Sequence, residues 1–272
     1  MSTTTQPPAP RPYRTPAAVR RALFALAALT GAFLVAGGVV SLLDLAARKT
    51  TEEVRTYAGI RSLDIADASD VRLTTAPAGS QLRVRARVTE GLRSPERDVR
   101  RAGGGTLELS SSCTILFSGS CGVDYEIAVP AGTAVRVDAK GGDVDAEDLV
   151  STHPVRLQTS GGDISATDVT APELRLSSSA GDVEGTGVRA PIVDAESSGG
   201  DVSLSLRTAP DRLDVNSSAG DVELVLPDET YRVDASTSAG DVDDQEVRTD
   251  PSSPRVIHAR SSAGDITIEA RR

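Results

Sequence analysis

Apolar and polar residues alternate strictly through the second half of the chain, and the alternation restarts about every 20 residues. In each unit a small residue stands four positions before the aspartate of a Gly-Asp pair, and Val or Ile follows the pair directly. The aspartates of these pairs are Asp143, Asp163, Asp182, Asp201, Asp221, Asp241 and Asp265, at successive separations of 20, 19, 19, 20, 20 and 24 residues. A period of two places alternate side chains on one face of a strand. Each unit therefore predicts a strand, a tight Gly-Asp corner and a second, shorter strand.

This repeat predicts an all-β fold, and within that class a β-solenoid of stacked two-strand coils of about 20 residues. The few aliphatic residues of one coil cannot offset the conformational entropy lost when the coil is ordered. Neighbouring coils must therefore share ladder hydrogen bonds and a continuous core. An antiparallel sandwich would not require the same corner in every unit.

The amino-terminal segment has a different composition. Residues 1–21 are Pro-rich and lack acidic side chains, which predicts a disordered cytoplasmic tail. Ala22–Leu43 contains no charged residue and is long enough to cross the ~30 Å hydrocarbon layer as one helix. A cleaved signal peptide is the alternative, but its apolar core is usually shorter, ~7–15 residues. We expect a retained single-pass anchor in the cell membrane.

The charges around this helix predict its orientation. The four basic residues before it are Arg11, Arg14, Arg20 and Arg21. Positive charge of this kind remains in the cytoplasm, so everything after the helix is expected outside it. From Asp44 onward the chain has 25 basic residues (29 minus 4) and 39 acidic ones, a net charge of −14. This argues against nucleic acid as a partner, and leaves the lipid bilayer, an envelope protein or a polysaccharide.

Residues 44–56 are expected to form a juxtamembrane linker, residues 57–130 an irregular β cap, and residues 131–272 the regular repeats. Within the cap, strands on either side of Asp70 resemble a degenerate first coil. The charged, Gly-rich stretch from Arg93 to Gly105 predicts a long exposed loop. Cys113 and Cys121 are expected to close a short hairpin loop as a disulfide, since no third cysteine or nearby histidine supports zinc.

Two motifs resemble a known family: Ser-Ser-Ala-Gly-Asp-Val, and Val-Asp-Tyr-Glu-Ile-Ala-Val-Pro-Ala-Gly-Thr at residues 123–133. Over about residues 57–272 the chain is similar to a bacterial, membrane-anchored β-strand-repeat family of unknown function that is labelled "putative adhesin". The resemblance implies a β-solenoid without agreed catalytic residues. Some relatives look like members of envelope-stress operons, which implies a signalling or surface-scaffold role.

The aspartate row is the first candidate for chemistry. A row of carboxylates could hold calcium, but the aspartate follows a single glycine and no second ligand recurs at fixed spacing. We therefore favour a structural corner, in which the aspartate accepts a hydrogen bond from its own turn while glycine takes a positive φ. No metal or cofactor is expected. The Ser and Thr residues beside the corner could form a sugar-like polar lattice, but bonding between coils is the favoured interpretation.

No arrangement of residues predicts catalysis. His153 and His258 are 105 residues apart, and no nucleophile elbow, phosphate loop or metal-ligand spacing occurs. The sequence therefore predicts a non-enzymatic envelope protein that presents a solenoid as an adhesin-like scaffold or interaction module, with no catalytic residues and an unknown binding site. The alternatives are a regulatory partner in an envelope-stress system and a polysaccharide-binding or polysaccharide-active protein. The strand at Ile266–Ala270 is expected to form the open end of the sheet, where a partner could dock.

Overall fold

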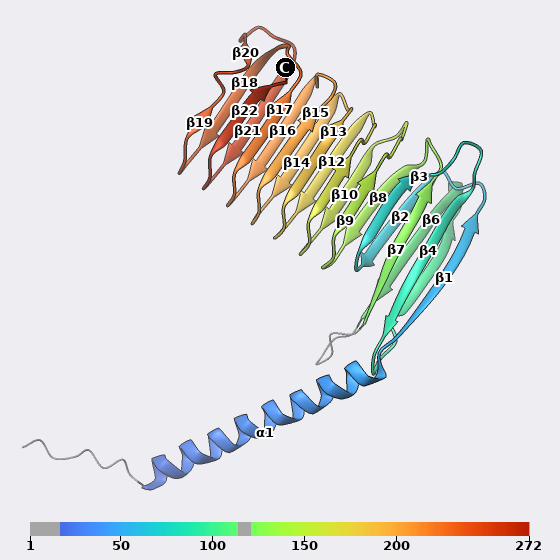
Figure 1. Cartoon of the computed structure of the whole chain (residues 1–272), viewed down its shortest axis with the longest axis vertical. Helices are drawn as coiled ribbons and strands as arrows, with labels where there is room; N and C mark the ends of the chain where they lie inside the picture. The colour runs from blue at the N-terminus through green and yellow to red at the C-terminus, as the bar shows by residue number, and fades with distance from the viewer. Residues whose placement is uncertain (1–16, 114–120, 272) are drawn as a thin grey trace, which may run out of the picture.

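The computed structural model describes residues 17–113 and 121–271, which form one helix followed by two 11-stranded sheets (Figure 1). The helix is α1 (Ala17–Ala47). The first sheet has the order β1 (Lys49–Tyr57), β4 (Leu82–Glu90), β7 (Gly122–Val129), β3 (Val71–Thr75), β9 (Val144–Glu147), β11 (Ile164–Thr167), β13 (Val183–Val188), β15 (Val202–Leu206), β17 (Val222–Leu226), β22 (Ile266–Ala270) and β19 (Val242–Asp243).

The second sheet pairs the other strand of each coil. Its order is β20 (Arg248–Thr249), β18 (Thr230–Thr237), β21 (Val256–Ser261), β16 (Arg212–Ser217), β14 (Ile192–Ser197), β12 (Glu173–Ser178), β10 (Val155–Thr159), β8 (Ala134–Ala139), β2 (Ser62–Ala68), β6 (Thr106–Ser112) and β5 (Glu96–Ala102). A short 3-10 turn, η1 (Gly103–Gly105), joins β5 to β6.

Successive coils stack in parallel, in the register that the repeat predicts. Leu157 of β10 is opposite Val137 on one side and Leu176 on the other. These three side chains are at most 1% exposed. Equivalent residues of the two sheets face each other and form one continuous core. The β-solenoid prediction is therefore confirmed, because each coil buries its aliphatic face only against its neighbours.

The coil predicted around Asp70 is present in the structure. Its strands β2 and β3 pair in parallel with β8 and β9, so this early segment stacks directly on the first regular coil. On its other side it pairs with β6 and β7. The division of the chain at residue 130 stays a prediction, because both sheets continue across that boundary.

The amino-terminal end contains two strands that the sequence did not predict. Where a linker was expected, α1 continues to Ala47 and β1 pairs antiparallel with β4 along its whole length. Where an exposed loop was expected, β5 pairs antiparallel with β6. Both predictions failed because these strands carry charged residues on faces where hydrophobic alternation would place aliphatic ones.

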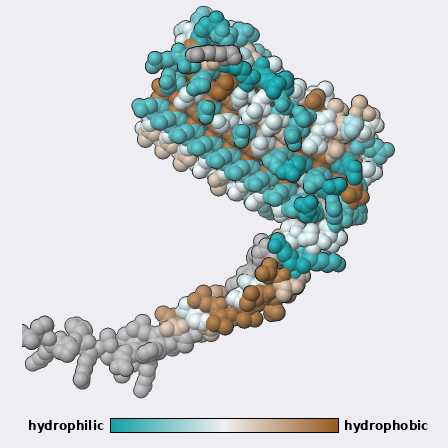
Figure 2. Space-filling view, in the orientation of Figure 1, coloured by the Kyte–Doolittle hydropathy of each residue, from teal (hydrophilic) through white to brown (hydrophobic). Residues whose placement is uncertain are grey.

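Helix α1 includes the apolar run expected to span a membrane. Its window Thr30–Ala47 has a mean hydropathy of 1.8, so by length and composition it could cross a bilayer. Figure 2 shows this apolar surface in brown beside the mostly hydrophilic solenoid. Residues 17–21, expected to be part of the disordered tail, belong to the helix, and residues 1–16 lie outside the described residues.

The carboxyl-terminal strand does not form the edge of the sheet, which corrects the expected docking edge. Strand β22 lies between β17 and β19, and β21 lies between β16 and β18. The last coil in sequence is therefore inserted between the two coils that precede it. The longer spacing of 24 residues before Asp265 allows the chain to pass around the preceding coil.

Candidate functional site: the repeat corner and a polar cleft

The predicted corner aspartates form a continuous hydrogen-bonded ladder along one side of the solenoid. The Oδ1 atom of each except Asp241 accepts a hydrogen bond from the backbone N–H of the aspartate in the next coil of the stack, for example Asp163 N–H to Asp143 Oδ1 at 2.9 Å. Asp70 begins the ladder by accepting from Asp143 at 3.1 Å. At the far end Asp241 donates to Asp265, which donates to Asp221. The sequence had predicted a hydrogen bond within each turn, and the structure corrects this to a bond between coils.

The glycine before each aspartate is required by contact between coils. A β-carbon at Gly181 would lie 2.2 Å from the carbonyl oxygen of Gly162 and 2.4 Å from Asp163 Oδ1. Of the regular corner glycines only Gly240 and Gly264 have φ in the left-handed range, at 149° and 150°. The predicted positive φ is therefore wrong for the other corners, where close packing of the backbone excludes any side chain.

The small residue four positions before the aspartate connects the same two coils. Ser178 Oγ donates to the Gly162 carbonyl at 2.8 Å and accepts from Gly181 N–H at 2.9 Å. Ser197 repeats the pattern, and both side chains are buried. These buried hydroxyls cannot form a polar lattice for a sugar, although the serines one position later are exposed.

The ladder contacts give the aspartates a structural role. One carboxylate oxygen of each linked residue is already a hydrogen-bond acceptor, and the side chains stand at the exposed corner. Within the described residues, no group of three or more His, Cys, Asp or Glu gathers as a set of metal ligands.

The predicted disulfide is present, with a different role in the fold. Cys113 and Cys121 are bonded, and their Cα atoms are 6.0 Å apart. Strands β6 and β7, which they join, belong to opposite sheets, so the bond closes a corner of the solenoid and not a β-hairpin. Residues 114–120 between them lie outside the described residues.

The two histidines are in separate environments. His153 follows a turn in which its N–H bonds to the Ser151 hydroxyl at 3.0 Å. The Nδ1 atom of His258 is 3.3 Å from Asp234 Oδ2 on the outer face of the second sheet. In the acidic pair Asp243–Asp244, Asp243 ends the short edge strand β19 and is exposed, and Asp244 follows it and is partly buried.

A cleft of about 360 Å³ lies at the amino-terminal end of the solenoid, and the sequence did not predict it. One wall is the inner face of β1, where Glu53, Arg55 and Tyr57 are paired with the inward residues Ala86, Val84 and Leu82 of β4. The opposite wall is β5, where Arg97 and Val99 are paired with Ser111 and Leu109 of β6. Polar side chains thus replace aliphatic ones at the end of the core.

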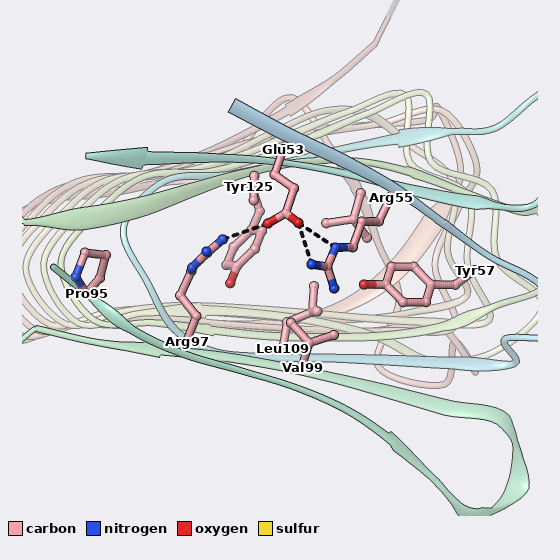
Figure 3. Close-up of a pocket in the computed structure, with 10 residues that line it drawn as sticks. Glu53, Arg55, Tyr57, Pro95, Arg97, Val99, Leu109 and Tyr125 are labelled. Atoms are coloured by element: carbon pink, nitrogen blue, oxygen red, sulfur yellow. Dashed lines mark hydrogen bonds and ion pairs between the residues drawn. The ribbon is translucent and has the colours of Figure 1, made fainter. Parts of the chain in front are cut away.

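Charged groups form the mouth of this cleft (Figure 3). Glu53 bridges the two walls, because its Oε1 accepts from Arg55 Nε at 2.7 Å and its Oε2 from Arg97 Nη1 at 3.1 Å. These hydrogen bonds hold the pKa of the Glu53 carboxyl below its usual value. The guanidinium carbon of Arg101 is 5.3 Å from the centre of the Tyr57 ring, so a cation–aromatic contact also links the two strands.

The floor of the cleft is apolar and contains one polar atom without a partner. Val84, Ala86, Leu109 and Tyr125 are at most 8% exposed. The Tyr125 hydroxyl is buried and forms no hydrogen bond with the described residues. The neighbouring Ser111 hydroxyl donates to the Asp67 carbonyl at 3.0 Å. Burial raises the pKa of Tyr125, whereas the positive charge of Arg97 and the neighbouring Ser111 hydroxyl act in the opposite direction.

The described residues form a β-solenoid preceded by one helix that could cross a membrane. The model of the Toastrack DUF4097 family matches residues 60–191 and 124–269, so the chain belongs to this family. No curated protein matches the chain.

Several solved structures are similar to this chain at low sequence identity. One is a "putative adhesin" from Parabacteroides distasonis, with 13% identity, a TM-score of 0.47 and coverage of 82% of this chain and 97% of that one. Another is a "putative adhesin" from Bacteroides fragilis, with 16% identity, a TM-score of 0.43 and the same coverage. A "putative lipid binding protein" from Parabacteroides distasonis has 12% identity and a TM-score of 0.42, over 82% of this chain and 97% of that one.

Proposed function

We propose that the protein is a single-pass envelope protein whose extracytoplasmic solenoid is a non-enzymatic scaffold for protein interaction. The main support is the junction between helix and solenoid. Asp44, in the last turn of α1, is 2% exposed and accepts a hydrogen bond from Leu92 N–H at 2.8 Å. A helix held in this way presents the solenoid in a fixed orientation, as an interaction scaffold requires.

Two further features support this topology. The arginines on the amino-terminal side of the apolar run Ala22–Leu43 favour a cytoplasmic amino terminus, and the Cys113–Cys121 disulfide fits an oxidising compartment for the solenoid.

The outer faces of the solenoid are suited to binding because their side chains stand in register. On the second sheet Arg156 is paired between Arg136 and Arg175, so three like charges lie on adjacent strands. Acidic residues continue this row, with Asp194 beside Arg175 and Asp214 beside Asp194. Rows of fixed charge on a rigid sheet favour a partner with complementary charge and regular spacing.

In-cell photo-crosslinking tests this function on each face separately. A photoreactive residue would replace Glu184, which is exposed on the first sheet, or Glu196, which is exposed on the second. The two sites are matched in residue type and exposure. We expect a discrete adduct with another envelope protein from one face and not from the other.

The outcome also separates the alternatives. An adduct with a sensor kinase would identify a regulatory partner. The absence of protein adducts at both faces, or turnover of a cell-wall glycan by the purified chain, would overturn the proposed scaffold function.

A further inference from the structure

We infer that the cleft between β1 and β5 is a binding site for a small amphiphilic anion, a compact anionic head group on a short apolar body. The head group would lie against Arg55, Arg97 and the Tyr125 hydroxyl, and the body on Val84, Ala86 and Leu109. This site is separate from the outer faces through which the scaffold function is proposed.

The charge balance of the cleft favours an anion. Arg55 and Arg97 line the cleft and carry two positive charges, and Glu53 is the one carboxylate that pairs with either of them among the described residues. The charged groups that line the cleft thus have a net charge of +1, two guanidinium groups minus one carboxylate. The outward charges of the same strands are paired separately, for example Arg100 with Asp98 at 2.8 Å.

The position of Tyr125 provides an independent indication of a ligand. A buried hydroxyl without a hydrogen bond is destabilising, so a group that bonds to it from within the cleft is favoured. The proximity of Arg97 places a cation close to this hydroxyl. One anionic oxygen could then accept from both the guanidinium and the hydroxyl, as charge-assisted recognition requires.

The floor and the size of the cleft define the rest of the ligand. Leu109, Val84 and Ala86 are at most 8% exposed, so they offer an apolar surface at the bottom of the charged mouth. A volume of about 360 Å³ is at the lower end of the range of roughly 300–1,000 Å³ for ligand pockets. A short alkyl or aryl group fits these limits, whereas an inorganic ion would leave the floor empty.

Calorimetric titration of the full-length protein in phosphatidylcholine nanodiscs tests the inference, with empty discs as the blank. The probes are acetate, hexanoate and octanoate, with hexanol as the uncharged counterpart. We expect affinity to rise by about fourfold per methylene as the floor fills, and hexanol to bind at least ~10-fold more weakly than hexanoate because it has no anionic group.

Variants separate the site from general charge effects. Arg97→Gln should weaken octanoate binding at least ~10-fold. Tyr125→Phe, which keeps the ring, should weaken it by about fivefold. Arg100→Gln is the matched control on the outward face of the same strand and should change affinity less than ~2-fold. Circular dichroism would show that each variant is folded.

Three results would overturn the inference: no saturable octanoate binding at millimolar concentration, equal affinities for acetate and octanoate, or equal losses in the Arg97 and Arg100 variants. An unchanged octanoate affinity in the Tyr125→Phe protein would show that the Tyr125 hydroxyl does not bind the ligand. Discs that contain phosphatidylglycerol distinguish the source of the ligand. Weaker apparent octanoate binding in them indicates a bilayer lipid, and unchanged binding indicates a soluble ligand.

Discussion

Two adjacent glycines in one corner differ in the space that a β-carbon would find. At Gly200 it would lie 2.4 Å from Asp182 Oδ1 and 2.6 Å from the carbonyl oxygen of Gly181. At Gly199 the nearest atom would be the Cα of Ala180, at 3.5 Å. We therefore predict that Gly200→Ala strongly destabilises the solenoid, whereas Gly199→Ala is tolerated.

The magnitude follows from the contacts of that corner. Overpacking a close backbone contact costs about 1–3 kcal/mol. Separating the coils also weakens the bond from Asp201 N–H to Asp182 Oδ1 at 2.9 Å and the bond from Ser217 Oγ to the Gly200 carbonyl at 3.1 Å, each worth roughly 1 kcal/mol. Gly200→Ala should thus lower the free energy of unfolding by about 3–5 kcal/mol. Gly199→Ala should change it by less than ~1 kcal/mol, because that position has room and an ordinary φ.

The assay is urea unfolding of the full-length chain in mild detergent, followed by circular dichroism in the β-sheet region. Coils can unfold independently in a solenoid, so the unfolding slope must be compared between variants before midpoints are converted to free energies. Equal midpoints for the two variants would show that close contact between coils is not the reason for a glycine at position 200. A greater loss for Gly199→Ala would also contradict it.

Three other changes test different parts of the structure. Ser197→Ala removes a buried hydroxyl that bonds to two coils and should lower the free energy of unfolding in urea by about 1–3 kcal/mol. The control Ser198→Ala, at an exposed serine, should be close to neutral. Similar losses of stability in both variants would show that burial of the hydroxyl is unimportant. Burial raises the pKa of Tyr231 to about 12 from its usual value of 10.0, so the neutral hydroxyl stabilises the fold fully below pH 10 and this contribution is lost as pH rises toward 12. Thermal melts should show a smaller loss in Tyr231→Phe than in the wild type, and a loss of equal size in both would exclude this residue as a source. Reducing the Cys113–Cys121 bond, with a sequence separation of 8, should cost about 2–3 kcal/mol, and an unchanged unfolding midpoint after complete reduction would contradict this estimate.

The amino-terminal strands show why part of the molecule could not be predicted. Hydrophobic alternation identifies a strand only when one face is aliphatic, as in β10 and β12. On β1 the inward positions are Glu53, Arg55 and Tyr57, and on β5 Arg97 stands beside Val99. These polar residues become inward-facing only because β4 and β6 offer them edges for pairing. The cleft that they line was therefore absent from the prediction.

The sequence by itself determined the repeat, its inward aliphatic rows and its glycine corners, because each depends on side-chain alternation within a single coil of about 20 residues. It also determined the apolar helix, through length and composition. Only the tertiary structure decided the order in which the coils stack. Strand β22 lies between β17 and β19, and the bonds of the aspartate ladder join different coils. Such contacts depend on which segments pair across the sheet. The sequence does not predict this pairing, because identical corners give every coil the same local pattern.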